Sequence, residues 1–374
     1  MKITVSKSEL YNKLSTIGKI ISTRNSIPSF DNFMFVVDEG LLTITAGEEG
    51  GQLSTNIESI TDMESFANVS FLIEAKIILD GLREIPEQPI VIEIEINKEF
   101  FDICVRYSNG KFELIGSNSD GYPTIDFDAS EEPIKISSES FLYGIRQSQI
   151  CCGNDELRPQ LNGMLIEKVK NGITYVSSDG AMLGMVEHSH EGKEKSSFIV
   201  PGRMVRILSK MYLPVEEDVI ITLGKGNIEI SFGKYKMVCR MLEGRFPNYR
   251  SVIPLDNEKI ATFNKADMVS ALKRVEVFCN ANSSLVILKF EENNLLISGY
   301  DFVFSTSAEE NIEVSYTSDP IEIGFKSSAL IDLLFNIPST EVVMSMKEPS
   351  SAALLRRSDS EDLTYLIMPM TINH

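Results

Sequence analysis

The sequence predicts an α+β protein made of three repeats of one domain, each with two helices and antiparallel strands. A strand followed by a helix occurs three times, and successive copies lie about 125 residues apart. Strand pairs with glycine at their turns follow in the repeats. A chain of 374 residues accommodates three domains of this size. Repeats this long are whole domains rather than the units of a solenoid.

The first strand–helix unit of the repeat starts near residues 3, 134 and 261. Ser6, Ser137 and Asn264 stand at the same place in the three copies, and all three residue types favour helix N-caps. Glu9 and Asp267 follow three positions later, where an acidic side chain suits the first helical turn. These features predict helices over 7–22, 138–152 and 265–277.

A second helix is predicted over 71–85, 198–212 and 323–337, so its copies start 127 and 125 residues apart. Gly110, Gly226 and Gly233 occupy the turns of strand hairpins that close the first two repeats. The repeat therefore places domain boundaries near Phe127 and Pro254. The predicted domains are 1–127, 128–254 and 255–374.

Composition narrows the class of protein. No apolar run approaches the ~18 residues of a membrane span. The N-terminal segment is interrupted by Lys7, Glu9 and Lys13, which is unlike a signal peptide. Five scattered cysteines have no metal-binding spacing, which predicts reduced thiols. We expect a soluble, cytoplasmic protein with no membrane contact.

The charge is distributed unevenly, although the net charge of −19 at first argues against nucleic acid. The six predicted helices sum to +5, which leaves −24 for the rest of the chain. The most basic helix carries Arg203, Arg206 and Lys210, spaced so that they share one helical face. Such a face is either merely solvated or contacts DNA phosphates.

Sequence motifs for catalysis are missing. The chain has no GxxxxGK[ST], GxSxG, HExxH or GxGxxG pattern. Its three histidines, His188, His190 and His374, have no cysteine or further histidine at ligand spacing. We expect no catalytic residue, no cofactor and no metal.

The segment from Met241 to Pro254 is an unusual connector. Pro247 and Pro254 oppose a regular helix or a central strand, yet Phe246, Tyr249 and Val252 are too apolar for a solvated linker. The segment is either an extended linker lying on the core or one wall of a binding site.

Two stretches carry a family resemblance: Gly244–Arg250, with the sequence GRFPNYR, and Met368-Pro369-Met370. The chain resembles the bacterial DNA polymerase III sliding clamp, the beta subunit, from Met1 to Met370. This resemblance implies three clamp-type domains that close with a second copy into a head-to-tail homodimeric ring around duplex DNA. It also implies a non-enzymatic processivity factor of DNA replication, whose partners are the DNA polymerase III catalytic subunit, the clamp loader, and other replication and repair proteins.

The resemblance also implies site residues. A peptide-binding groove would be formed by Leu161, Ser178, Gly180, Leu183, Pro247, Ser251, Val252, Leu366, Ile367, Met368, Pro369 and Met370. The dimer interface would pair Phe112 and Leu114 of one copy with Val277 and Phe278 of the other. Arg24 matches a loop position that touches the DNA backbone, and Arg158 is a further DNA candidate.

The sequence departs from the common family pattern at three places. Ala181-Met182 replaces His-Arg, Pro159-Gln160 replaces a tyrosine pair, and Thr371-Ile372-Asn373-His374 replaces a final Arg-Leu. These changes make the rim of the groove less basic, so they bear on client preference more than on the groove itself.

Three interpretations remain at this stage. The favoured one is a processivity clamp, because a ring that encloses the duplex stays on DNA without tight binding, even when the protein is acidic. The second is a three-domain peptide-binding scaffold without DNA, and the third is an enzyme with an unrecognised site. Solution mass and retention on circular DNA would separate them.

Overall fold

The structure is a computed structural model that describes residues 1–38, 40–58, 60–62, 69–97, 100–190, 195–213 and 216–372. Asn373 and His374, at which the sequence departs from the family pattern, lie outside these residues. The chain divides into two compact units. Unit 1 comprises Met1–Phe141 and Lys210–Met241, and unit 2 comprises Leu142–Ser209 and Leu242–His374. The middle of the chain therefore contributes to both units.

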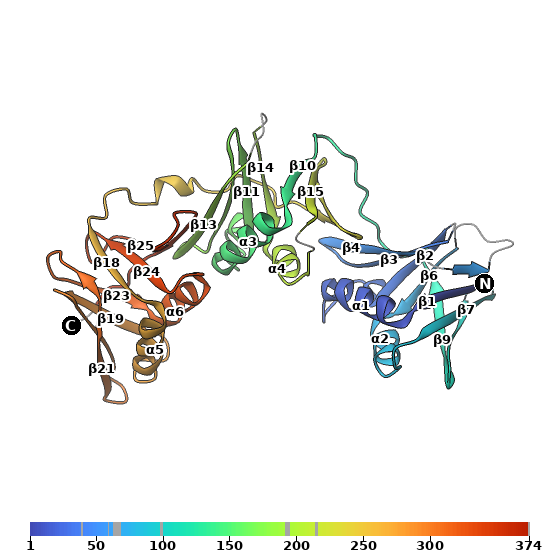
Figure 1. The fold of residues 1–374 in the computed structure, drawn as a ribbon, viewed down its shortest axis with the longest axis horizontal. Helices are drawn as coiled ribbons and strands as arrows, with labels where there is room; N and C mark the ends of the chain where they lie inside the picture. The colour runs from blue at the N-terminus through green and yellow to red at the C-terminus, as the bar shows by residue number, and fades with distance from the viewer. Residues whose placement is uncertain are drawn as a thin grey trace. The chain divides into compact units, whose positions relative to one another are not determined.

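The threefold repeat of elements is present. Each repeat opens with a strand and a helix, continues to a second strand–helix pair, and ends in three antiparallel strands. The first helices are α1 (Lys7–Ile17), α3 (Ser138–Ser148) and α5 (Lys265–Glu276). The second helices are α2 (Ala75–Arg83), α4 (Gly202–Ser209) and α6 (Ser327–Asn336). In Figure 1, α1 lies beside α2 in unit 1, and α5 lies beside α6 in unit 2.

The three predicted N-caps are confirmed. The Ser6 hydroxyl accepts from the Glu9 N–H at 3.3 Å, and the Ser137 hydroxyl accepts from the Ser140 N–H at 3.3 Å. The Asn264 side-chain oxygen accepts from the N–H groups of the first turn of α5, the nearer at 2.8 Å. These bonds satisfy donors that a helix leaves without an internal partner.

The predicted start of the second helix is wrong by the same four residues in every copy. Residues 71–74, 198–201 and 323–326 are the ends of the strands β6 (Val69–Glu74), β14 (Ser196–Pro201) and β23 (Ile321–Lys326). A short apolar run buried on both faces lacks alternation, so periodicity alone does not separate a strand from a helix. Because the error is equal in each copy, the offsets of 127 and 125 residues remain.

The described part of unit 1 holds one thirteen-stranded antiparallel sheet that combines strands of two repeats. Strand β17 pairs with β4, where Met237 lies opposite Leu53. In spatial order the strands are β10 (Ile134–Ser137), β15 (Asp218–Leu223), β16 (Asn227–Phe232), β17 (Tyr235–Arg240), β4 (Gly51–Glu58), β3 (Leu41–Glu48), β2 (Asn32–Asp38), β6, β9 (Gly110–Asn118), β8 (Phe100–Tyr107), β7 (Pro89–Asn97), β1 (Lys2–Ser6) and β5 (Ile60–Asp62).

Unit 2 holds two antiparallel sheets within its described residues. The nine strands of the larger sheet are β14, β11 (Gly163–Val169), β12 (Gly172–Ser178), β13 (Met182–Ser189), β26 (Leu363–Ile367), β25 (Ala353–Arg357), β24 (Glu341–Met346), β18 (Lys259–Asn264) and β22 (Ser315–Tyr316). The smaller sheet runs β21 (Thr306–Glu313), β20 (Asn294–Asp301), β19 (Leu285–Glu291) and β23. The pairing of β13 with β26 brings the C-terminal strand beside a strand of the middle repeat.

The strands β9 and β21 are among those that leave a sheet edge open in the described residues. In unit 1, β9 pairs with β8 along its length but with β6 only through Ser117 and Asn118. In unit 2, β21 pairs with β20 and forms the end of its sheet. Open edges invite pairing with another chain unless they are protected. No described helix combines the length and the apolar character needed to cross a membrane.

Candidate functional site

A buried cluster in unit 2 joins three of the predicted groove residues. Leu161, Leu183 and Leu366 belong to one core cluster, and each has at most 6% of its surface exposed. Leu161 lies in the 3-10 helix η4 (Pro159–Asn162), whereas Leu183 and Leu366 are directly opposite each other on β13 and β26. These three side chains form an apolar floor, in which strand pairing sets the positions of Leu183 and Leu366.

The C-terminal segment continues beyond β26 and is held by backbone bonds. Met368 N donates to Ala181 O at 2.8 Å, and Met370 N donates to Gly324 O at 2.8 Å. Ile367 is buried, whereas Met368 keeps 43% of its surface exposed. A chain end frays unless it is tied down, so these bonds explain how an apolar terminus keeps its place.

The predicted connector lies against the same floor. Phe246 and Tyr249 are buried members of the cluster, whereas Pro247 and Ser251 are exposed and Val252 is 56% exposed. The short helix η5 (Tyr249–Ser251) turns the chain here. The segment thus buries its two aromatic rings and presents small apolar groups to solvent.

A polar network fastens the connector to the sheet. The Tyr249 hydroxyl donates to the Glu167 carboxylate on β11 at 2.8 Å. The Arg250 guanidinium lies 3.6 Å from Glu167 and 3.4 Å from Glu187 on β13, and stacks over the Tyr249 ring at 5.0 Å. Burial and the bond to Glu167 raise the pKa of Tyr249 well above its usual range, so the phenol stays a hydrogen-bond donor.

Ser178 and Gly180 form the tight turn between β12 and β13. The Ser178 hydroxyl donates to Met182 O at 2.7 Å and accepts from Gly180 N at 3.1 Å. Gly180 has a φ of +94°, which L side chains rarely adopt. The turn therefore depends on glycine at this position, and Asp179 Oδ1 closes it by accepting from the Ala181 and Met182 N–H groups.

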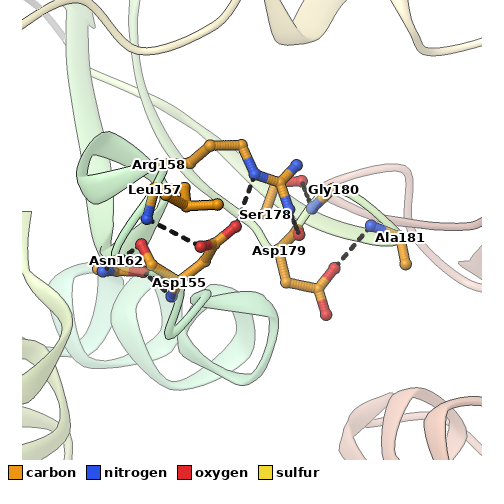
Figure 2. Close-up of polar contacts among 8 residues, drawn as sticks. All are labelled: Asp155, Leu157, Arg158, Asn162, Ser178, Asp179, Gly180 and Ala181. Carbon is orange, nitrogen blue, oxygen red and sulfur yellow. Dashed lines mark hydrogen bonds and ion pairs between the residues drawn. The ribbon is translucent and has the colours of Figure 1, made fainter.

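Arg158 lies over this turn. Figure 2 shows its guanidinium between Asp155 and Asp179, with a 2.9 Å ion pair to Asp155 and a 3.4 Å bond to the Asp179 carbonyl. A Cβ built on Gly180 would stand 2.5 Å from the Arg158 Nη1, so a larger residue here would displace the end of this arginine. The Leu157 N–H and the Arg158 guanidinium lower the pKa of Asp155. Arg158 thus binds the turn that holds Ser178 and Gly180 while remaining exposed.

Pro369 and Met370 line a hollow of about 520 Å³. Its other lining residues are Glu322, Pro349, Ser350, Thr371 and Ile372. The sequence did not indicate that Glu322, Pro349 and Ser350 belong near the C-terminus. Their proximity depends on the long-range bridge between Gly324 and Met370, for which a single sequence carries no local signal.

The DNA candidates are exposed cations in both units. Arg24 lies in the loop before the 3-10 helix η2 (Pro28–Asp31) of unit 1. Arg203 and Arg206 lie three residues apart on α4 and are exposed. Lys210 does not continue that helix as predicted, because α4 ends at Ser209, and Lys210 belongs to unit 1.

The candidate interface residues adjoin the two open strand edges. Phe112 and Leu114 are half-buried on β9, and the ring of Phe112 packs on Gly81 of α2. Val277, which caps α5, is 76% exposed, and Phe278 is 42% exposed. Thr306, the first residue of β21, donates through its hydroxyl to Phe278 O at 3.2 Å. Phe112 and Leu114 therefore lie on one strand with an open edge, and Phe278 contacts the start of the other.

Comparison with known families decides the classification. Three family models match in chain order: the N-terminal domain of the DNA polymerase III beta subunit at residues 1–126, its central domain at 135–248, and its C-terminal domain at 250–371. The chain belongs to the DNA polymerase III beta subunit family. Members of this sliding-clamp family are non-enzymatic processivity factors of DNA replication.

Relatives match along the full chain. The Beta sliding clamp of Vibrio cholerae is 26% identical over 374 residues, and that of Escherichia coli is 25% identical over 373, with each comparison covering 100% of both chains. Among solved structures, the DNA polymerase III subunit beta of Pseudomonas aeruginosa superposes with a TM-score of 0.90 at 22% identity, covering 100% of both chains. A putative beta subunit from Eubacterium rectale gives 0.90 at 21%, with the same coverage. The three α+β domains predicted from the repeat, and the clamp type that the resemblance implies, are thereby confirmed.

Proposed function

We propose that two copies of this sliding clamp close head to tail around duplex DNA and tether the catalytic subunit of DNA polymerase III. The observation that carries the proposal is the buried apolar cluster of unit 2, in which Phe246 of the connector joins Leu183 and Leu366. The connector and the C-terminal segment also carry the exposed apolar side chains of Val252 and Met368. A surface of this kind suits a short apolar peptide, because flexible methionine repacks around different anchors.

The peptide-binding groove consists of the twelve residues named from the family resemblance. Its floor is fixed by strand pairing, and its connector wall is fastened through Tyr249. A client motif with two apolar anchors gains about 2 kcal/mol from each buried side chain. After the cost of ordering the peptide, micromolar affinity is the expected scale. The clamp loader and other replication and repair proteins would use the same groove.

The ring rests on the two open strand edges. Two copies joined head to tail through a pair of equal contacts close on themselves, whereas a single contact type without closure makes a filament. Phe112 and Leu114 of one copy would meet Val277 and Phe278 of the other. The domain boundaries near Phe127 and Pro254 are part of this proposal, and the limits of the three family matches support them.

DNA contact is electrostatic and sequence-independent in this proposal. Arg24, Arg158, Arg203, Arg206 and Lys210 would touch phosphates, since a sliding protein must not read bases. The Arg158 charge is shared with Asp155, so we expect it to contribute less than Arg24. Enclosure, rather than these contacts, would keep the clamp on DNA. The clamp would work in the cytoplasm, where the chromosome lies.

The experiment that tests the groove is titration of a labelled client peptide. The peptide, which carries a clamp-binding motif of a DNA polymerase III catalytic subunit, is titrated by fluorescence anisotropy into wild type and into the Met368→Ala, Val252→Ala double variant. We expect micromolar binding to wild type and at least tenfold weaker binding to the variant. Equal affinity would place the peptide site elsewhere.

A further inference from the structure

The hollow of about 520 Å³ beside the C-terminal segment is lined by a single charged side chain, that of Glu322. Its remaining walls are alkyl or hydroxyl surface, supplied among others by Pro349, Ser350, Thr371 and Ile372. A long basic side chain needs apolar walls for its stem and an acceptor for its charged head. The composition of the hollow therefore suits lysine or arginine.

The end of the described chain runs past Glu322. Glu322 is half-buried on β23, two residues before Gly324, whose carbonyl accepts from Met370 N at 2.8 Å. The bridge between Gly324 and Met370 is antiparallel, so the chain approaches Glu322 as it continues from Met370 to Ile372. The residues that follow the groove thus form one side of the hollow, and Glu322 lies next to them.

The negative charge of Glu322 is only weakly compensated. Lys289 stands opposite Glu322 in the pairing of β19 with β23, but its ammonium binds Glu291 at 2.7 Å. The bond to Glu291 is the main cause of the raised pKa of Lys289, and Glu322 is the smallest contributor. Lys326 is four residues along the strand, about 13 Å away. Within the described part of the chain, Glu322 itself forms no ion pair.

Thr371 adds to this imbalance. It lines the hollow and stands where the common family pattern has arginine. A neutral side chain at this position leaves the Glu322 carboxylate open to a cation from another molecule.

We propose that the hollow accepts a lysine or arginine side chain of a client peptide whose apolar anchors occupy the groove. The inference rests on the proposed peptide-binding groove. Met368 and Met370 are two residues apart, so the hollow begins about 7 Å beyond the exposed Met368. An extended peptide crosses that distance in about two residues, which places the basic residue about two to four positions from an apolar anchor.

Arginine fits the hollow better than lysine. Its planar guanidinium can donate two parallel bonds to the Glu322 carboxylate, and its further N–H groups can reach the hydroxyl oxygens of Ser350 and Thr371. Lysine offers one ammonium without that fork. The site would thus select clients by a charge next to their apolar motif, beyond the apolar contacts that any client makes.

Paired peptides test the charge preference. Labelled peptides share one set of apolar anchors and carry either arginine or glutamate, at about two to four positions before or after the anchors. Each peptide is titrated by fluorescence anisotropy into the full-length protein. For at least one position, we expect the arginine peptide to bind wild type about fivefold more tightly than its glutamate counterpart, as a partly exposed ion pair allows.

The variants Glu322→Gln and Thr371→Arg should reduce this advantage to about twofold or less, because the first removes the carboxylate and the second supplies a cation of the chain's own. The protein carries a net charge of −19, so general attraction for cations needs a control. Glu341→Gln removes the same charge from an exposed position on β24, outside the hollow, and should keep the wild-type advantage.

The outcomes separate this site from the groove. Equal binding of the arginine and glutamate peptides to wild type, or an advantage that persists in Glu322→Gln, would overturn the basic-residue site while leaving the groove in place. Failure of every peptide to bind wild type would overturn the groove and this site together.

Discussion

The Tyr249 hydroxyl and the Glu167 carboxylate, 82 residues apart in sequence, are joined by a 2.8 Å hydrogen bond that fixes the connector to the middle repeat. The bond helps to explain how a connector whose only regular element is the short helix η5 keeps the Tyr249 ring buried while Val252 stays exposed. It also links a residue of the family-like GRFPNYR stretch to a strand, β11, that contributes no predicted groove residue.

Removing this bond should loosen the proposed groove. The Tyr249→Phe variant loses the donor to a partly buried carboxylate, so we expect it to be less stable by about 1 kcal/mol and to bind the client peptide more weakly. Thermal unfolding and peptide titration measure the two effects. Tyr235→Phe, on β17 of unit 1, is the control. Peptide affinity equal to wild type would remove Tyr249 from any positioning role.

Truncation tests the C-terminal wall. Deleting Met368–His374 removes the exposed Met368 and the bond from Met370 N to Gly324 O, while β26 ends before the cut at Ile367. We expect peptide binding and polymerase stimulation to be abolished and the dimer to remain. A shorter deletion of 371–374, which keeps Met370, should retain most of the binding. Binding that survives the longer deletion would contradict the assignment.

Much of this architecture can be predicted from the sequence, because residues close together in the chain determine the helix starts and strands of each repeat. The N-caps at Ser6 and Asn264 and the alternation at Phe112 and Leu114 are local signals that the structure preserves. The start of α2 has no such local signal in the sequence. Phe71–Ile73 is buried on both faces of its strand, and a run of that kind has the same pattern in a helix.

Site geometry is harder to predict because distant segments build it. The sequence shows that the connector is apolar. It does not show that Tyr249 reaches Glu167 or that Arg158 covers Gly180. The hollow beside Met370 depends on the pairing of the chain end with β23, a contact across more than forty residues. Such contacts follow from the assembled sheets rather than from any window of sequence.

Charge at the proposed interface should separate the subunits. Val277→Asp with Phe278→Asp places two carboxylates where apolar contact is proposed, and burying an unpaired charge costs several kcal/mol. We expect a folded monomer by sedimentation and circular dichroism, since Val277 is 76% exposed in the single chain. Leu255→Asp should remain a dimer. If the double variant also sediments as a dimer, the interface is misplaced.

The cations at and just after α4 should determine how strongly DNA affinity depends on salt. Replacing Arg203, Arg206 and Lys210 by Ala should weaken transient DNA binding and lower the slope of log affinity against log salt by about 0.9 for each lost phosphate contact. A charge-matched variant, with Lys225, Lys234 and Lys289 replaced by Ala, should keep the wild-type slope. Equal slopes in the two variants would show that Arg203, Arg206 and Lys210 do not face DNA.

Retention on DNA of different topology tests the central claim of enclosure. The protein is loaded by a clamp loader onto a nicked circular plasmid, separated from free protein by gel filtration, and then challenged with an enzyme that cuts the circle once. We predict that the clamp elutes with the intact circle at high salt and leaves after linearisation, because a ring escapes only over a free end. Equal retention before and after cutting, or none on the circle, would contradict the account.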